Sequence, residues 1–167
     1  FGKGEFKALM PKYYPPKFKK YIKEDTTLLQ NKVKGAKRIL EAGVGTGRLI
    51  PELAPLVSEF IGIDIAGLML KKSRQVAKEF SNVRIVKGEL ENLSKIFPEN
   101  HFDFSLCVWN TLGNTKDKEV KILKELSKVT SRSIFITVFH RGHFNDRKNL
   151  YNTLGVKIKK IDRKNEY

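Results

Sequence analysis

A glycine-rich stretch, Glu41-Ala42-Gly43-Val44-Gly45-Thr46-Gly47, is the segment of this chain whose residue types best suit ligand binding. Glycines at alternate positions let a chain turn tightly and bring its backbone within contact distance of a ligand, because no Cβ intervenes. The stretch lies between a predicted strand and a predicted helix. We therefore expect a ligand-binding loop here, with an acid two residues before its first glycine.

A second acid, Asp64, ends the next predicted strand, where doubly wound folds hold a ribose diol by paired hydrogen bonds. A dinucleotide site would have the pattern G-x-G-x-x-G. Here the third glycine, Gly47, comes one residue early, and Arg48 stands at the expected position. The carboxylate of Glu41 would repel a pyrophosphate but attract an ammonium or a sulfonium. The spacing therefore favours a zwitterionic, net cationic nucleoside over a dinucleotide.

The same stretch resembles the first motif of the class I (Rossmann-like) S-adenosylmethionine-dependent methyltransferases, E/D-x-G-x-G-x-G, at every defined position. This resemblance implies S-adenosyl-L-methionine as the cofactor and methyl transfer as the activity. It also implies that Gly43, Gly45 and Gly47 approach the methionine part of the cofactor. Glu41 would contact the amino group, directly or through water, and Asp64 would hold the ribose hydroxyls.

The resemblance further implies an adenine site built from Ile65 and the step Gly88-Glu89-Leu90. Glu89 would accept a hydrogen bond from the adenine amino group, with Leu90 against one face of the ring and Ile65 over the other. Taken by itself, Glu89 is better interpreted as a solvated charge at a strand end. Tyr14 is either an aromatic residue that closes over the cofactor or one that packs on the surface.

The loop after the fourth predicted strand starts at Asn110 and should face the transferable methyl group, because active sites of open α/β sheets lie outside the carboxyl ends of the strands. Asn110 either orients an incoming nucleophile or is a turn residue at the strand end. Family members that modify exocyclic amino groups of bases carry Pro-Pro and an aromatic residue after this position. Their absence here makes the segment more similar to members that act on small molecules.

Two histidines, His140 and His143, follow the fifth predicted strand as H-x-x-H. A metal site would need a third ligand that the sequence does not supply, so we expect no metal. His140 could still reach the pocket as a general base, which methyl transfer needs only when the nucleophile arrives protonated. Cys107, Phe104 and Trp109 lie in an apolar run and are expected in the core.

Short apolar runs rich in Ile, Val and Phe alternate with longer amphipathic runs from Arg38 onward, and predict buried parallel strands separated by helices. In the last of these helices Val120, Leu123, Leu126 and Val129 recur at every third position. This alternation predicts an α/β fold, a doubly wound, mostly parallel Rossmann-like sheet flanked by helices.

Two parts are expected: a basic, aromatic arm with a helix over residues 1–37, and a cofactor-binding domain over residues 38–167. The resemblance is clear from about Arg38 to Phe139. The family's sheet has two further strands after the fifth, whereas only Val156 to Ile161 looks like a strand here. We therefore expect that C-terminal strands are missing, and that residues are also missing before Phe1.

The composition is that of a globular chain, with 33 Lys and Arg against 18 Asp and Glu and a net charge of +15. We expect a small-molecule acceptor; the alternative is a methyltransferase or binding module that acts on RNA or DNA through its basic surface. No apolar run approaches the roughly 20 residues of a membrane span. The single cysteine cannot form an intrachain disulfide, so a reducing, cytoplasmic location is expected. The sequence does not indicate an oligomeric state.

Overall fold

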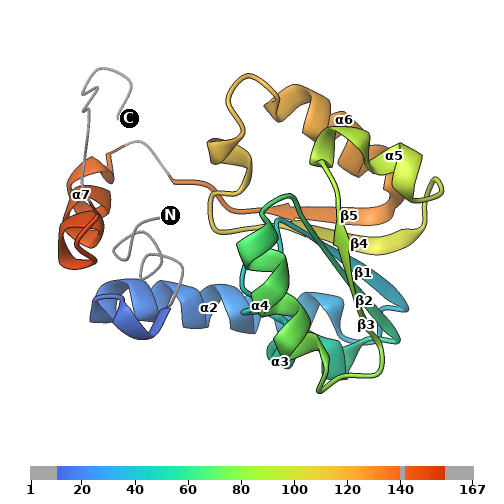
Figure 1. The fold of residues 1–167 in the computed structure, drawn as a ribbon, viewed down its shortest axis with the longest axis horizontal. Helices are drawn as coiled ribbons and strands as arrows, with labels where there is room; N and C mark the ends of the chain where they lie inside the picture. The colour runs from blue at the N-terminus through green and yellow to red at the C-terminus, as the bar shows by residue number, and fades with distance from the viewer. Residues whose placement is uncertain (1–10, 140–141, 157–167) are drawn as a thin grey trace. The chain divides into compact units, whose positions relative to one another are not determined.

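Five strands form one sheet in the order β3-β2-β1-β4-β5 in the computed structural model, which describes residues 11–139 and 142–156 (Figure 1). Every neighbouring pair of strands is parallel. Their bounds are Arg38–Ala42 (β1), Glu59–Asp64 (β2), Val83–Lys87 (β3), Phe102–Cys107 (β4) and Thr130–Ile136 (β5). The predicted doubly wound α/β fold is confirmed.

The central strands bury both of their faces, because successive side chains of a strand point to opposite sides of the sheet. On β1, Ile39 enters one apolar cluster and Leu40 enters the other. On β2, Phe60 and Ile61 divide in the same way. All four side chains are fully buried. Such strands need helices on both sides of the sheet, and the structure supplies them.

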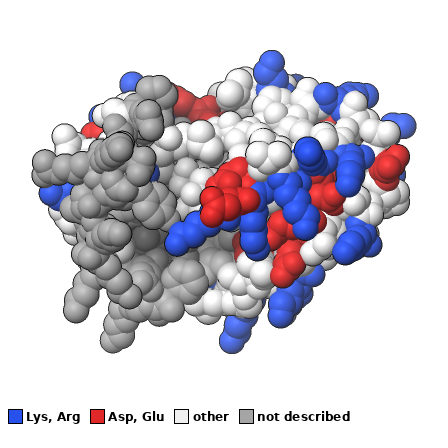
Figure 2. All heavy atoms as spheres, turned by 90° about the horizontal axis from the view of Figure 1, so that it is seen from above, with Lys and Arg blue, Asp and Glu red and all other residues white. Residues whose placement is uncertain are grey.

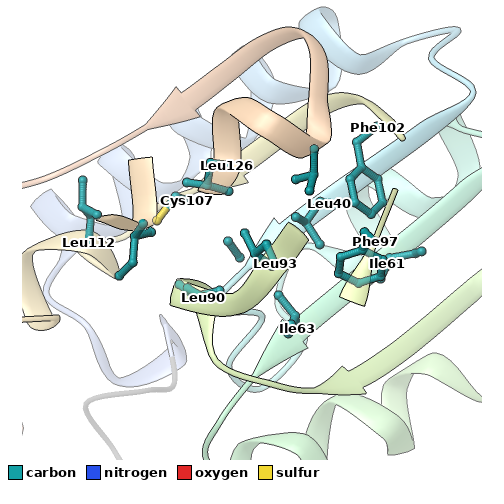
Figure 3. Close-up of a cluster of buried hydrophobic side chains, with 13 residues drawn as sticks. Leu40, Ile61, Ile63, Leu90, Leu93, Phe97, Phe102, Cys107, Leu112 and Leu126 are labelled. Carbon is teal, nitrogen blue, oxygen red and sulfur yellow. The ribbon is translucent and has the colours of Figure 1, made fainter. Parts of the chain in front are cut away.

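One face is covered by η3 (Leu90–Asn92), α5 (Leu93–Ile96) and α6 (Glu119–Val129). Figure 3 shows side chains of this cluster from the strands, including Leu40 and Ile61, gathered with Leu93 of α5 and Leu126 of α6. The other face is covered by α3 (Ile50–Leu53), η2 (Ala54–Leu56), α4 (Gly67–Ala77) and the last turns of α2 (Pro16–Val33). The molecule thus has the three layers that a doubly wound fold requires.

Two helices differ in detail from the sequence prediction. The helix after the glycine-rich loop is only four residues long and continues as the 3₁₀ turn η2, because Pro55 has no N–H with which to extend α3. On α6 the buried face is formed by Ile122, Glu125, Leu126 and Val129. Val120 was predicted to share this face and is 67% exposed, because an α-helix repeats every 3.6 residues, so a strict three-residue spacing drifts around it.

The chain divides into two compact units, residues 28–138 and, together, residues 1–27 and 139–167. The first holds the sheet. In the second, the structure describes η1 (Pro11–Tyr13), the first turns of α2, and α7 (Phe144–Thr153). The predicted division into residues 1–37 and 38–167 stays a prediction. The predicted strand from Val156 lies outside the described residues from position 157 onward. No helix within the described part combines the length and apolar character that a bilayer crossing needs.

The loop between β4 and α6 contains the short turn η4 (Leu112–Asn114). Leu112 is buried in the cluster of Figure 3, together with Cys107 at the end of β4. The loop is therefore anchored to the core at Val108 and Leu112, which belong to the two apolar clusters on opposite faces of the sheet, while the residues between and after them are half-buried or exposed.

Candidate functional site

The predicted site residues from Glu41 to Asn110 lie around the carboxyl ends of neighbouring strands. β1 pairs with β2 on one side and with β4 on the other, so the strand order reverses at β1. Open α/β sheets bind ligands outside the strand ends at such a reversal, because the loops there diverge to opposite faces of the sheet. Two loops flank this point, the glycine loop (residues 43–49) after β1 and the β4 loop (residues 108–115).

The glycine loop is held by backbone hydrogen bonds to the end of β2. The N–H groups of Gly43 and Val44 both donate to the carbonyl of Ile63, at 2.8 and 3.0 Å, and Gly47 N–H donates to the carbonyl of Val44 at 3.0 Å. Gly43, Gly45 and Gly47 all have positive φ, at 82°, 54° and 83°. L-residues with a side chain rarely adopt this region, so the glycine spacing follows directly from the path of the loop.

The three glycines face different surroundings. A Cβ at Gly43 would overlap the Thr111 side chain of the β4 loop. A Cβ at Gly47 would lie 2.8 Å from Ile50 Cδ1 and 3.1 Å from Ser73 Cα of α4. At Gly45 the nearest atom to a Cβ would be the Gly43 carbonyl oxygen, 3.9 Å away. Gly43 and Gly47 therefore allow close packing within the protein, and only Gly45 opens onto space that a ligand could enter.

Glu41, at the end of β1, is buried to 4% exposure, and its Oε2 atom has no hydrogen-bond partner among the described residues. Burial raises the pKa of this carboxyl to about 8; the positive charge of Arg48 opposes the rise, and the negative charge of Asp64 adds to it. A buried polar atom without a partner is costly unless a ligand supplies one. The carboxyl is thus placed to receive a cationic or hydrogen-bond-donating group.

Asp64, at the end of β2, accepts two backbone hydrogen bonds. Gly45 N–H donates to Oδ2 at 2.9 Å, and Ala66 N–H donates to Oδ1 at 2.8 Å. Sequence reasoning assigned Asp64 only to the ribose, and missed that this carboxylate also fixes the glycine loop at its open glycine. Each carboxylate oxygen can accept more than one hydrogen bond, so Asp64 can hold the loop and still accept from a pair of hydroxyls.

The residues predicted around the adenine lie at the ends of β2 and β3, which pair from Phe60 with Val83 to Asp64 with Lys87. Ile65 is 60% exposed, as a residue that covers a ligand should be before binding. Glu89 is exposed, and its Oε2 accepts from Asn92 Nδ2 at 2.9 Å. Leu90 is 9% exposed and belongs to the apolar cluster beneath η3. The adenine contacts of Ile65, Glu89 and Leu90 stay predictions.

Asn110 lies at a sharp corner that ends β4. It has a φ of 63°, and its N–H donates to the Thr137 carbonyl at 2.9 Å. Its side chain lies over Gly113, where a Cβ would overlap Oδ1, and its Nδ2 donates to Asn114 Oδ1 at 3.2 Å. The structure thus gives Asn110 the geometry of a turn residue, one of the two interpretations left open, and a role toward a nucleophile stays a prediction.

The other predicted residues lie away from these loops in sequence. Tyr14 is buried within the unit of residues 1–27 and 139–167. His143 Nδ1 lies 3.1 Å from Asp146 Oδ2 in the same unit, and Lys17 Nζ lies 2.7 Å from that oxygen. His140 lies outside the described residues. Within the described ranges, no three His, Cys, Asp or Glu side chains gather as metal ligands would.

The expectations for the apolar run of β4 are met in part. Cys107 is fully buried, and burial raises the pKa of its thiol to about 11, as befits a core residue without nucleophilic character. Phe104 packs against the cluster under α3 and α4. Trp109 is half-buried, with a φ of 57°, at the corner after the strand. Sequence reasoning missed Thr137, whose hydroxyl oxygen accepts from Trp109 N–H across tertiary structure, and Thr111, whose side chain lies against Gly43.

Comparison with known proteins gives a family for this segment of the chain. A family model described as a methyltransferase domain matches residues 39–133, which is more than half of the chain. The match runs from β1 into β5 and therefore includes the glycine loop, Asp64 and the β4 loop.

A curated relative, phosphoethanolamine N-methyltransferase 3 of Arabidopsis thaliana, is 28% identical over 115 residues, which are 66% of this chain and 23% of that protein. The chain thus spans about a quarter of the length of this relative. The crystal structure of the PH0226 protein from Pyrococcus horikoshii OT3 is 22% identical with a TM-score of 0.76, covering 97% of this chain and 75% of that one. An S-adenosylmethionine-dependent methyltransferase from Methanosarcina mazei is 23% identical with a TM-score of 0.60, covering 75% and 61%. These structures share the fold.

Proposed function

We propose that this chain, which belongs to the class I S-adenosylmethionine-dependent methyltransferase family, transfers a methyl group from that cofactor to a small-molecule acceptor. The cofactor of the family is S-adenosylmethionine. The observation that carries the proposal is the buried Glu41 carboxyl, whose Oε2 has no partner in the described chain, beside a glycine loop that is open at Gly45.

The residues at the strand ends fit this cofactor. Glu41 would take its cationic amino group, and Asp64 would take the two ribose hydroxyls. Gly45 leaves the space that a Cβ would fill. When bound, S-adenosylmethionine supplies a methyl group on a sulfonium, which is already a good leaving group. What remains for the chain is to hold the acceptor in line with that methyl group and to exclude water.

The acceptor that we favour is a small molecule with a nucleophilic amine. Support comes from the relatives, since both matched Arabidopsis proteins are named phosphoethanolamine N-methyltransferases. Support also comes from Asn110, which no Pro-Pro-aromatic sequence follows. Asn110 is the candidate for orienting such an amine, and His140 is the candidate for deprotonating it. A cytoplasmic location stays a prediction that rests on the single cysteine.

Action on RNA or DNA is the alternative, and it rests on the net charge of +15. A nucleic-acid site needs basic side chains gathered on one surface. On the face shown in Figure 2, Lys and Arg side chains are interspersed with Asp and Glu side chains among the described residues. Interspersed charges of this kind are ordinary for a solvated surface and give this alternative no further support.

Transfer of a radioactive methyl group from labelled S-adenosylmethionine distinguishes the two acceptor classes. The chain would be incubated with phosphoethanolamine, with a set of small amines and, separately, with mixed tRNA. We expect label in a small-molecule product and none in tRNA. Label confined to tRNA, with binding that weakens steeply as salt is added, would contradict the small-molecule proposal.

A further inference from the structure

The corner after β4 is a tight turn with an unusual occupant. The Val108 carbonyl accepts from Thr111 N–H at 3.3 Å and from Thr111 Oγ1 at 2.9 Å, which closes a four-residue turn. Its two central residues, Trp109 and Asn110, both have positive φ, at 57° and 63°. Turns of this kind favour Gly, Asn or Asp at these positions, and a bulky residue there is a conformational outlier. Such strain persists only where neighbouring contacts enforce it.

Thr137, the first residue after β5, makes three hydrogen bonds to this corner. Its N–H donates to the Cys107 carbonyl at 3.3 Å, and its carbonyl accepts from Asn110 N–H at 2.9 Å. Its hydroxyl oxygen accepts from Trp109 N–H at 2.8 Å. The first two bonds come from the backbone and would be available to any residue except proline. The bond to Trp109 needs a side-chain acceptor of this length at this position.

The corner also touches the cofactor side of the site. Thr111, the last residue of the turn, packs against Gly43 so closely that a Cβ there would overlap its side chain. Asn110 lies across Gly113 toward Asn114. The position of the corner therefore decides where the acceptor-facing loop stands relative to the glycine loop.

We propose that Thr137 is a positioning residue, which sets the acceptor side of the site by holding Trp109 and Asn110 in their left-handed conformation. Its role toward the acceptor rests on the proposed function; its role in holding the corner does not. Thr137 itself contacts neither Glu41 nor Asp64 in any described hydrogen bond. Its loss should therefore reduce use of the acceptor more than affinity for the cofactor, which the corner reaches only through the contact of Thr111 with Gly43.

Trp109 is the only tryptophan of the chain, so its fluorescence reports on the corner directly. Thr137→Val removes the hydroxyl and keeps the shape of the side chain, whereas Thr137→Ser keeps the hydroxyl. We expect quenching of Trp109 by acrylamide to rise about twofold or more in Thr137→Val and to return to the parental value in Thr137→Ser. If Thr137→Val fails to fold, Thr137→Ala removes the same acceptor and gives the same reading.

The matched control is Thr130→Val, at the other end of β5. Thr130 Oγ1 donates to the Leu126 carbonyl at 2.6 Å and also lies 2.6 Å from Ser105 Oγ, so this variant loses at least as much hydroxyl hydrogen bonding as Thr137→Val but does so away from the corner. It should lower the melting temperature without changing the quenching of Trp109. The proposal would be overturned if Trp109 in Thr137→Val were quenched no more than in the parent. It would also be overturned if Thr130→Val increased the quenching of Trp109 as much as Thr137→Val does.

The second measurement tests the acceptor role of Thr137 through steady-state kinetics with the small amine that the parent methylates. Loss of one hydrogen bond that places the acceptor should reduce kcat/KM roughly fivefold to tenfold, with a change of no more than about twofold in affinity for S-adenosylhomocysteine and with rescue in Thr137→Ser. An unchanged kcat/KM in Thr137→Val would overturn the acceptor role. If the parent neither binds S-adenosylhomocysteine nor methylates an amine, the proposed function fails, and the Trp109 reading still decides whether Thr137 holds the corner.

Discussion

At the scale of single residues, Glu41 is buried, its Oε2 has no hydrogen-bond partner within the described ranges, and the positive charge of Arg48 opposes the rise of its pKa. A core position would ordinarily be occupied by an apolar residue, so this arrangement costs stability in return for a binding group. Asp64 has two roles in this account. Its carboxylate is predicted to bind the ribose, and it also fixes the glycine loop by accepting from the Gly45 N–H.

Replacing Glu41 with Gln tests its burial through pH. The pKa of Glu41 rises from an ordinary 4.5 to about 8 in the folded chain. Between these values the folded state keeps a proton that the unfolded state has lost, so this group contributes less to stability as pH rises through that window. We expect the free energy of unfolding of Glu41→Gln to equal that of the parent at pH 5 and to exceed it by about 1–3 kcal/mol at pH 9.

Urea unfolding at both pH values measures this difference, with exposed Glu79→Gln as the control. The same stability difference at pH 5 and pH 9 would mean that the Glu41 carboxyl does not hold its proton above the ordinary range.

Gly45→Val tests the opening of the glycine loop. A valine here carries the strain of a φ of 54° and fills the open space in front of the loop. Gly35→Val is the matched control, because Gly35 has a φ of 78° and open space around its Cβ position, but lies outside the glycine loop. Both variants should lose about 1–2 kcal/mol of stability.

Calorimetric titration with S-adenosylhomocysteine separates the two variants. Only Gly45→Val should bind at least about tenfold more weakly than the parent. Parental affinity in Gly45→Val would show that the loop merely connects β1 to α3.

At the scale of elements, α6 shows how much the sequence could predict. The short apolar runs predicted strands that alternate with helices, because strands buried on both faces need continuous apolar sequence, and the structure has five such strands in one parallel sheet. The buried stripe of α6 was placed wrongly at Val120, and Glu125, which no apolar pattern would select, lies on the buried face instead. Thr137 was missed because its partner Trp109 is distant in sequence, and the packing of Thr111 against Gly43 was missed for the same reason.

Glu125→Ala tests the link between α6 and α5. Glu125 Oε2 accepts from the backbone N–H of Ser94 at 2.8 Å and from its hydroxyl at 2.7 Å, and Oε1 pairs with Lys128 at 2.6 Å. These bonds to Lys128 and Ser94 lower the pKa of Glu125 to about 2. The stabilisation is therefore present above the ordinary pKa and is lost as pH falls toward 2.

We expect Glu125→Ala to lower the free energy of unfolding by about 2 kcal/mol at pH 7 and by less than this near pH 2.5. Denaturant unfolding at the two pH values measures it, with exposed Lys124→Ala as the control. A loss that does not depend on pH would mean that Glu125 stabilises α6 through its apolar stem rather than through its charge.

At the scale of the whole molecule, the glycine loop and Asp64 could be located from the sequence because both lie at the ends of short, regular strands of the unit of residues 28–138. Their contacts with the cofactor stay predictions. The proposed acceptor side could not be located in the same way, because it rests on tertiary contacts of the β4 loop, and because the candidate base His140 lies outside the described part of the chain. The excess of basic residues did not identify a partner, because charge alone does not specify a site.

Calorimetric titration of the chain with S-adenosylhomocysteine and, separately, with NAD tests the central claim most directly. Both compounds contain an adenosine moiety whose ribose could reach Asp64. Only the first presents an ammonium to Glu41, whereas the second would bring a pyrophosphate toward the same carboxyl. We predict saturable binding of S-adenosylhomocysteine, with a Kd on the order of micromolar, and no measurable heat with NAD. Saturable binding of NAD together with no binding of S-adenosylhomocysteine would contradict the account.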